Sequence, residues 1–282
     1  MKRILVATDL SERSDRAIDR AVSLCKEFGA HLSVLHVIDE DLPVSIAEEQ
    51  RRVAERDLRE HLFSLRGAED VAVDFLIDVG KDWMQILRRS ESDQFDLVVL
   101  GMHRARGLAG LFRGTTVERV VRNGDMPVLV VKDRATKPYQ QIAVGIDFSV
   151  YSRRALEFAL GFAPKAQLRL LHIYSVPFKT FLNGSADSDE GRQSAQVQLK
   201  HMVNEEMKVF VAGLEKRLGQ AQTVIVEGDP QRAIREQIKD LNANLLVLGT
   251  HGRTGMARAL LGSVAEDFLA DPPCDIMVVK AW

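Results

Sequence analysis

The chain repeats one pattern of residues, and this internal repeat limits the possible folds more than any other feature of the sequence. Residues 4–11 (Ile-Leu-Val-Ala-Thr-Asp-Leu-Ser) are matched by residues 142–149 (Ile-Ala-Val-Gly-Ile-Asp-Phe-Ser). Further matches follow in the same order, pairing residues 35–37 with 171–173, 79–80 with 227–228, and 100–103 with 248–251. Because this order is kept along a chain of 282 residues, we expect two similar domains, each long enough to bury its own core.

Differences between the two copies indicate where the domains meet and where one copy is longer. Residues 133–140 carry charges and Pro138, as a short linker does, so we predict domains at 1–136 and 137–282. Matched residues keep a constant separation from Gly80 and Gly228 onward, which places the length difference before that point. The extra residues of the second copy, about 178–193, are rich in Gly, Ser and Asp and predict a surface excursion.

Short apolar segments alternate with amphipathic ones in both copies, which is typical of a parallel sheet covered by helices. The predicted strands are residues 4–7, 32–37, 71–77, 97–100 and 128–131, then 142–146, 168–173, 223–226, 245–248 and 276–279. After each first strand an apolar stripe predicts a helix, formed by Ala17, Ala21, Leu24, Cys25 and Phe28, and by Ala155, Phe158, Ala159 and Phe162. We therefore predict an α/β fold class of two tandem Rossmann-like domains, each a five-stranded parallel sheet flanked by helices, with right-handed crossovers.

Composition and charge exclude several classes of protein. A hydrophobic share of 46% excludes a disordered chain, and a formal net charge of -2 provides no overall positive field for nucleic acid or a membrane surface. Cys25 and Cys274 lie outside any CxxC spacing, so we expect free, buried thiols in a reducing compartment. No apolar run approaches the length that spans a bilayer. The apolar run of residues 4–7 is too short for a secretory signal, so we expect a cytoplasmic protein.

A glycine-containing loop follows the fourth predicted strand of the second copy, at the sheet edge where open α/β proteins bind ligands. Gly249 and Gly252 are followed, after nine residues, by Gly262 and Ser263, where a helix with free amides that attract anions is predicted to begin. Together with Asp147 at the end of the first strand, this loop closely resembles the nucleotide-binding motif of the universal stress protein family. The resemblance covers nearly the whole chain as two tandem domains, and it implies their adenine nucleotide alpha hydrolase-like fold.

The resemblance implies that the second copy binds ATP or another adenine nucleotide, which could bring magnesium with it. In that family the first-strand Asp approaches the adenine, residues after the second strand line the ribose and base pocket, and the glycine loop with its Ser or Thr holds the phosphates. Carried over by position, the nucleotide-binding residues are Asp147, Ile173, Gly228, Gly249, His251, Gly252, Arg253, Gly262, Ser263 and Val264. Arg253 and Arg258 would add positive charge over a phosphate site.

The first copy departs from the family motif at one position. The candidate residues of this second site are Asp9, Val37, Gly101, His103, Arg104, Gly114 and Thr115, with Arg104 where the family has its second glycine. The Arg104 side chain could fill the space that a phosphate needs, or its guanidinium could contact a phosphate directly. A Cβ also removes the freedom to adopt a positive φ if the turn requires it. We favour the first alternative and expect the second copy to be the better nucleotide site.

Many of these residues also have a purely structural interpretation. Asp9 and Asp147 could cap the loops after their strands, while His36 and His172 are expected to hydrogen-bond near the sheet end rather than to hold a metal. We predict no metal site built by the protein, because no HExxH motif or close histidine and carboxylate cluster exists. The charged residues 48–60 predict a solvated helix with i,i+4 pairs, and an apolar stripe predicts helix core at Val203, Met207, Phe210, Val211 and Leu214.

The resemblance implies a stress-response protein in which the nucleotide serves regulation or sensing. We expect binding rather than turnover, with slow ATP hydrolysis at most, because the sequence has no Walker lysine, no GxSxG elbow and no recognisable acid and base pair. A receiver-type phosphorylation module fits less well, because Asp78 and the glycine loops do not reproduce its acidic cluster. The alternative function is an interaction scaffold of the same family without nucleotide, acting through its surface near residues 183–191.

The resemblance also bears on partners. Single-domain members of the family pair through their last strands, so residues 128–131 and 276–279 are expected to lie edge to edge as an intramolecular pseudo-dimer, which would hide two sheet edges at once. A homodimer of such chains is a further option. We expect a small-molecule nucleotide as the ligand, with no direct contact to nucleic acid or membrane.

Overall fold

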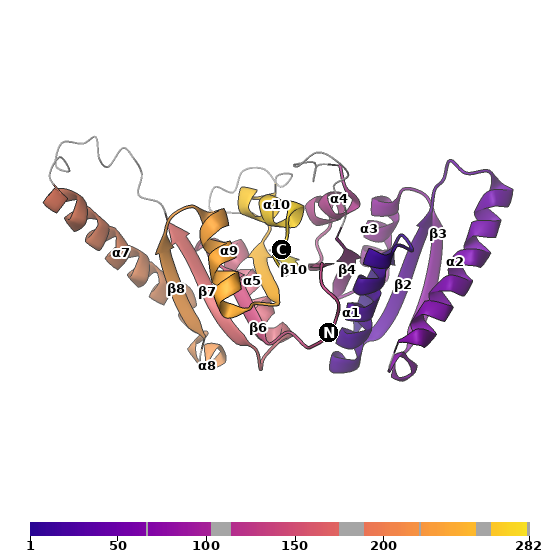
Figure 1. The fold of residues 1–282 in the computed structure, drawn as a ribbon, viewed down its shortest axis with the longest axis horizontal. Coiled ribbons are helices and arrows are strands. Elements are labelled where there is room, and N and C mark those ends of the chain that lie inside the picture. Colours follow the sequence, from indigo (N-terminus) through magenta and orange to yellow (C-terminus); the bar gives the residue numbers. More distant parts are fainter. Residues whose placement is uncertain (66, 103–113, 175–188, 220, 252–260, 281–282) are drawn as a thin grey trace.

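The computed structural model describes residues 1–65, 67–102, 114–174, 189–219, 221–251 and 261–280, and the predicted α/β fold class is confirmed (Figure 1). The first half contains β1 (Arg3–Thr8), α1 (Glu12–Phe28), β2 (His31–Ile38), α2 (Val44–Ser64), a 3-10 turn (Ala68–Asp70), β3 (Val73–Val79), α3 (Asp82–Ser92), β4 (Leu97–Gly101), α4 (Thr116–Asn123) and β5 (Val128–Val131). The second half contains β6 (Gln141–Gly145), α5 (Val150–Phe162), β7 (Gln167–Tyr174), α7 (Asp189–Val211), α8 (Glu215–Leu218), β8 (Gln222–Glu227), α9 (Pro230–Leu241), β9 (Leu245–Gly249), α10 (Ser263–Ala270) and β10 (Asp275–Val279).

The described strands form one continuous sheet with the order β3-β2-β1-β4-β5-β10-β9-β6-β7-β8. Neighbouring strands are parallel within each half, and the halves join where β5 and β10 pair antiparallel, with Ile276 opposite Val130. The expectation that the last strands of the two copies lie edge to edge is confirmed. In each half the first strand lies between the second and the fourth, so the strand order reverses beside β1 and beside β6.

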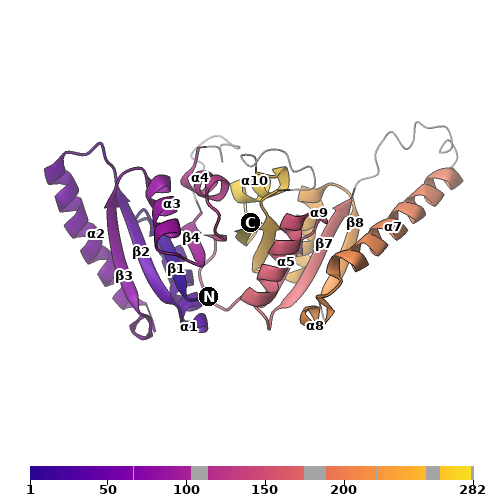
Figure 2. The same cartoon turned by 180° about the vertical axis from the view of Figure 1, so that it is seen from behind.

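Helices cover both faces of the sheet, as the near-continuous apolarity of the strands predicts (Figures 1 and 2). On one face α1, α2, α5 and α7 pack over a core that includes Val6 of β1 and Val144 of β6. On the other face α3, α4, α9 and α10 pack over residues such as Leu5 and Ala143. Each half is therefore doubly wound, and its carboxyl-terminal strand ends remain at one edge.

Two predicted boundaries are wrong by a few residues. The third strand begins at Val73 rather than residue 71, because the Val71 N–H closes the preceding turn by donating to the Ala68 carbonyl at 3.1 Å. The excursion expected at residues 178–193 ends earlier, since α7 begins at Asp189. Residues 178–188 lie outside the described residues.

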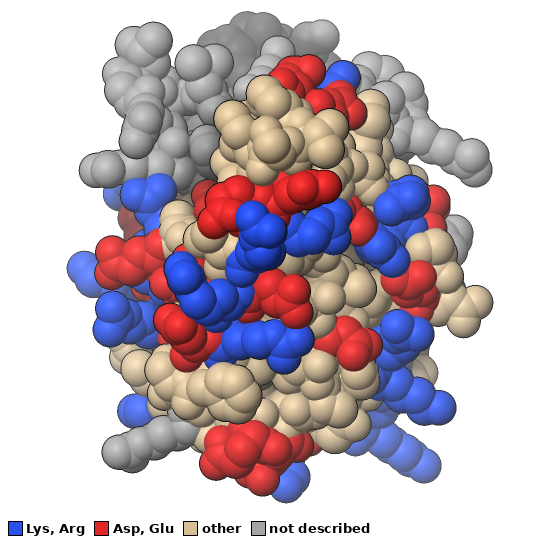
Figure 3. Space-filling model, turned by 90° about the vertical axis from the view of Figure 1, so that its right-hand side faces the viewer, with Lys and Arg blue, Asp and Glu red and all other residues tan. Residues whose placement is uncertain are grey.

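The charged helix and the buried stripe were predicted correctly. In α2 the ion pairs Arg52–Glu49, Arg59–Glu55 and Arg56–Glu60 lie on the solvent side, and Figure 3 shows Lys and Arg interspersed with Asp and Glu over this end of the molecule. Val203, Met207 and Leu214 are buried, with Phe210 and Val211 packed against the same core. None of the described helices combines the length and apolar character needed to cross a membrane.

Cys25 and Cys274 are free and buried, as predicted. Burial raises the pKa of each thiol to about 12, so both are protonated and unreactive at neutral pH.

A buried carboxylate fastens the linker to both halves. Asp275, at the start of β10, accepts hydrogen bonds from the Lys132 backbone N–H at 2.8 Å and from the Tyr139 hydroxyl at 2.6 Å. The Arg20 guanidinium of α1 lies 3.4 Å from the same carboxylate and stacks 4.3 Å over the Tyr139 ring. Because a buried charge is tolerated only when paired, this cluster fixes how the two halves meet.

Candidate nucleotide site

The predicted residues of the second half lie along one edge of the sheet. Asp147 follows β6 and Gly249 ends β9, the two strands between which the strand order reverses. Ile173 lies near the end of β7 and Gly228 directly follows β8, so both are at the same edge. Gly252 and Arg253 of the second half, and His103 and Arg104 of the first, lie outside the described residues.

Asp147 and Asp9 form the same turn in the two halves. One carboxylate oxygen of Asp147 accepts the Ser149 N–H at 3.0 Å, and one of Asp9 accepts the Ser11 N–H at 3.0 Å. Burial raises the pKa of Asp9, but hydrogen bonds from Ser11 and Ser14 outweigh it and leave this pKa below its ordinary value. Each turn uses Oδ1, while Oδ2 of Asp147 has no hydrogen bond to any described residue. Both aspartates therefore cap the loops after their strands through Oδ1, and Oδ2 of Asp147 can still accept a hydrogen bond from a ligand.

Gly249 and Gly101 are needed by the fold itself. A Cβ on Gly249 would lie 2.7 Å from the backbone carbon of Tyr151, at the start of α5. A Cβ on Gly101 would lie 3.1 Å from the backbone of α1 at Ser14. These glycines let the first helix of each half cross close to the fourth strand, so packing accounts for their presence without a ligand.

The N-terminus of α10 is open. The Gly262 N–H donates to the Thr250 carbonyl at 2.8 Å, which draws the chain back against the end of β9. No side chain caps this helix, and the N–H groups of Ser263, Val264 and Ala265 find no acceptor among the described residues. Unpaired amides and the positive end of the helix dipole together favour an anion at this position.

The N-terminus of α4 is closed by its own side chains. Thr115 caps the helix by accepting the Glu118 N–H through Oγ1 at 3.1 Å. The Glu118 carboxylate accepts the N–H of Gly114. Gly114 is the first-half equivalent of Gly262, and its φ is +87°. Among the described residues, the two predicted sites thus agree in the Asp turn after the first strand and in the glycine that ends the fourth strand, and they differ at the helix terminus.

His251 is held against the second-half site. Its Nδ1 lies 2.9 Å from Thr250 Oγ1, and its ring packs on Tyr151 with centroids 4.8 Å apart. Nε2 is buried without a hydrogen bond to any described residue. Burial, assisted by the positive charge of Lys280, lowers the pKa of His251, so the ring is neutral and keeps one nitrogen available to a ligand.

The other predicted residues of the sheet edge have structural partners. Nδ1 of His36 donates to the Thr8 carbonyl at 3.0 Å and Nδ1 of His172 to the Ile146 carbonyl at 2.8 Å, so the hydrogen bonds predicted for both histidines are present. Three remaining apolar candidates are partly buried against the core on the face that α3, α4, α9 and α10 cover: Val37, Ile173 and Val264. Among the described side chains, no three His, Cys, Asp or Glu residues gather as metal ligands.

Sequence reasoning missed Glu118 and Arg122. The spacing Thr115-x-x-Glu118 is a capping-box pattern and could have pointed to Glu118. Arg122 could have been found by comparing the copies, since Ala270 stands at the matching position. The interpretation of the first copy rested instead on Arg104.

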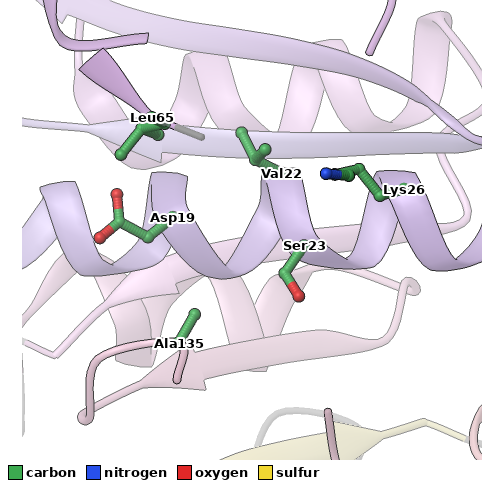
Figure 4. Close-up of a pocket in the computed structure, with 6 residues that line it drawn as sticks. All are labelled: Asp19, Val22, Ser23, Lys26, Leu65 and Ala135. Carbon is green, nitrogen blue, oxygen red and sulfur yellow. The ribbon is translucent and has the colours of Figure 1, made fainter. Parts of the chain in front are cut away.

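A separate cavity of about 360 Å³ lies beside α1. Figure 4 shows Asp19, Val22, Ser23 and Lys26 along this helix, with Leu65 on one side of it and Ala135 on the other. None of the residues that line this cavity is a predicted site residue.

Comparison with known proteins places both halves together in one family. The sequence profile of the universal stress protein family matches residues 1–132 and again residues 138–280. A universal stress protein E homolog of Haemophilus influenzae is 24% identical, over 99% of this chain and 97% of the relative. A universal stress protein of Methanocaldococcus jannaschii is 31% identical, over 50% of this chain and 82% of the relative.

Solved structures show the same fold. A universal stress protein from Archaeoglobus fulgidus superposes with a TM-score of 0.70 at 23% identity, covering 99% of this chain and 98% of that one. The two-domain arrangement is therefore also found in a solved structure.

Proposed function

The chain belongs to the universal stress protein family, and we propose that it is a stress-response protein that binds ATP or another adenine nucleotide in its C-terminal domain. The nucleotide would serve regulation or sensing. We further propose that the domains divide at residues 136 and 137, within the linker between the two matched regions.

The difference between the two helix termini supports the choice of the C-terminal domain. At α10 the amides of Ser263, Val264 and Ala265 lack described acceptors, whereas at α4 the Glu118 carboxylate and Thr115 hydroxyl accept the N–H groups. Phosphates need unpaired donors in a positive field, and of these two termini, as far as the described residues show, α10 offers both. This single contrast is the observation on which the proposal rests.

The residues would act in three groups. Asp147, through its free Oδ2, and the edge residues Ile173 and Gly228 would hold the adenosine. The phosphates would lie on the loop and helix residues Gly249, His251, Gly252, Arg253, Gly262, Ser263 and Val264, with Arg253 opposing their charge. A magnesium ion would enter with the nucleotide as phosphate counterion, held by phosphate oxygens and water.

We propose binding rather than turnover, with slow ATP hydrolysis at most, because the sequence offers no Walker lysine and no recognisable general base. A cytoplasmic location agrees with the two free, buried thiols. The strand edges β5 and β10 are already paired with each other, so any homodimer would form through another surface.

An interaction scaffold without nucleotide is the second candidate. It is favoured by exposed apolar side chains on α7, where Val197, Met202 and Val209 are 65%, 67% and 75% exposed. Such side chains on an outer helix are available to a partner protein.

Mass spectrometry of small molecules released from the purified protein, followed by calorimetric titration of ATP, ADP and AMP into stripped protein, tests the proposal. We expect about one adenine nucleotide per chain, lost in G252R, which copies Arg104 into the second half. No released nucleotide, and no heat at millimolar concentrations, would contradict nucleotide binding and favour the scaffold.

A further inference from the structure

Both glycine loops end in the same capping pattern. Thr115 and Glu118 at the start of α4 correspond to Ser263 and Glu266 at the start of α10. In such a box the hydroxyl accepts an N–H of the first turn and the Glu carboxylate turns back to an N–H before the helix. If the pattern alone decided the structure, the two termini would be equally closed.

At α4 the pattern is completed, and a carboxylate lies where an anion would bind. The Glu118 carboxylate accepts the Gly114 N–H, and its side chain is only 8% exposed. The Thr115 hydroxyl takes the Glu118 N–H at 3.1 Å. The negative charge that the helix terminus attracts is therefore supplied by the chain itself.

At α10 the equivalent carboxylate faces the other domain. Glu266 Oε2 lies 3.7 Å from a terminal nitrogen of Arg122, and the Ser263 side chain makes no cap. Figures 1 and 2 both show α4 and α10 side by side over the junction. Arg122 Nε also lies 2.8 Å from Glu118 Oε1, so one guanidinium contacts both carboxylates.

Arg122 has no counterpart in the second copy, where Ala270 stands at the matching position. One residue at the domain junction therefore contacts both carboxylates. Its guanidinium lies beside Glu118, which accepts the Gly114 N–H, and also beside Glu266 of the other half.

We propose that Glu118, positioned by Arg122, is the specificity-determining residue that closes the N-terminal domain to phosphate and leaves the nucleotide to the C-terminal domain. Two anions do not share one amide, and a buried carboxylate repels an incoming phosphate through a medium that screens weakly. This inference rests on the proposed function and assigns the closure to Glu118, whereas the sequence had pointed to Arg104.

The test replaces Glu118 by Gln, which keeps its shape and removes its charge, and also by Ala in case the Gln amide still caps the helix. Because Arg104 replaces a family glycine, each variant is made alone and together with R104G. R104G by itself and E266Q serve as matched controls. Nucleotides bound per chain are measured by titration with ATP, and thermal melts establish that each variant is folded.

We expect about one nucleotide per chain for the wild type, R104G and E266Q, rising to about two when R104G is combined with E118Q or E118A. Amide exchange at Gly114 should also accelerate in E118A, because its acceptor is gone. Two nucleotides in R104G alone, or one in every combined variant, would overturn the inference while leaving the proposed function intact. If the wild type binds no nucleotide, the proposed function fails, but the combined variants still test the role of Glu118. One nucleotide per chain in those variants would support that role, and no nucleotide would refute it.

Discussion

The helices α4 and α10 share a residue pattern at their N-termini, but side chains cap the N-terminal N–H groups of α4 and leave those of α10 without an acceptor among the described residues. Each has eight residues, and Thr115, which caps α4, and Ser263, which begins α10, each follow a glycine and have a Glu three positions later. In α4 those side chains occupy the terminus, and in α10 they leave it open. A shared motif therefore does not by itself settle how a helix begins, and we attribute the difference in available polar groups to Arg122, which contacts a carboxylate of each half.

The rest of the junction shows how far the two halves still agree. Lys132 donates through Nζ to the Pro273 carbonyl at 3.2 Å, and the matching Lys280 donates to the Gly124 carbonyl at 3.0 Å. Asp275 breaks this symmetry, because Pro127 stands at its position in the first copy. Joining two copies in one chain lets each half acquire contacts that a symmetric pair of chains could not have.

The largest expected effect is on nucleotide binding at the glycine loop of the second half. Replacing Gly252 by Arg should remove detectable nucleotide binding, a loss of at least about 100-fold in affinity or ~2.7 kcal/mol, because the side chain would compete for phosphate space. Calorimetric titration with ATP measures it, and G252A is the control for the loss of glycine alone. Unchanged affinity in G252R would mean that this loop does not hold the phosphates.

The second prediction compares the packing glycines of the two halves. G249A should lower the free energy of unfolding by about 3 kcal/mol and G101A by about 1 kcal/mol, because the added Cβ meets backbone more closely at Gly249. The structure gives 2.7 Å to Tyr151 in one case and 3.1 Å to Ser14 in the other. Urea unfolding of both variants tests the order, and an equal loss would contradict the difference in helix approach.

The third prediction concerns the two first-strand carboxylates. D147N should weaken ATP binding about tenfold, or ~1.4 kcal/mol, while D9N should leave it unchanged, because only the second half is expected to hold the base. Asn keeps a side-chain acceptor for the Ser149 N–H, so the turn is preserved. Equal weakening in both variants would show that the first half also binds nucleotide.

The smallest effect is a pH dependence from Asp9. Its pKa is lowered in the folded protein, since hydrogen bonds from Ser11 and Ser14 outweigh burial, so its ionisation stabilises the fold above the unfolded-state pKa. This contribution should disappear as pH falls through the folded pKa. Urea unfolding of wild type and D9N at pH 6 and at about pH 3 measures it. A stability difference that grows on acidification would contradict the lowered pKa.

The fold could be predicted from the sequence because each strand is marked by a local apolar run and the same order of elements occurs in both halves. Apolar runs predicted the ten strands to within about two residues, and the resemblance to the universal stress protein family implied that residues 128–131 and 276–279 would pair. The contact between Arg122 and Glu266 could not be predicted the same way, because it depends on how α4 and α10 meet across the junction. Gly249 shows a related limit: the motif suggested a ligand, whereas close packing against Tyr151 already requires glycine.

A crystal structure with a non-hydrolysable ATP analogue tests the central claim most directly. We predict one analogue per chain, with its phosphates on the N–H groups of Ser263 and Val264, its adenine near Asp147, and the Glu118 carboxylate still on the Gly114 N–H. An analogue bound at α4 with Glu118 displaced, or no analogue in the C-terminal domain, would contradict the account.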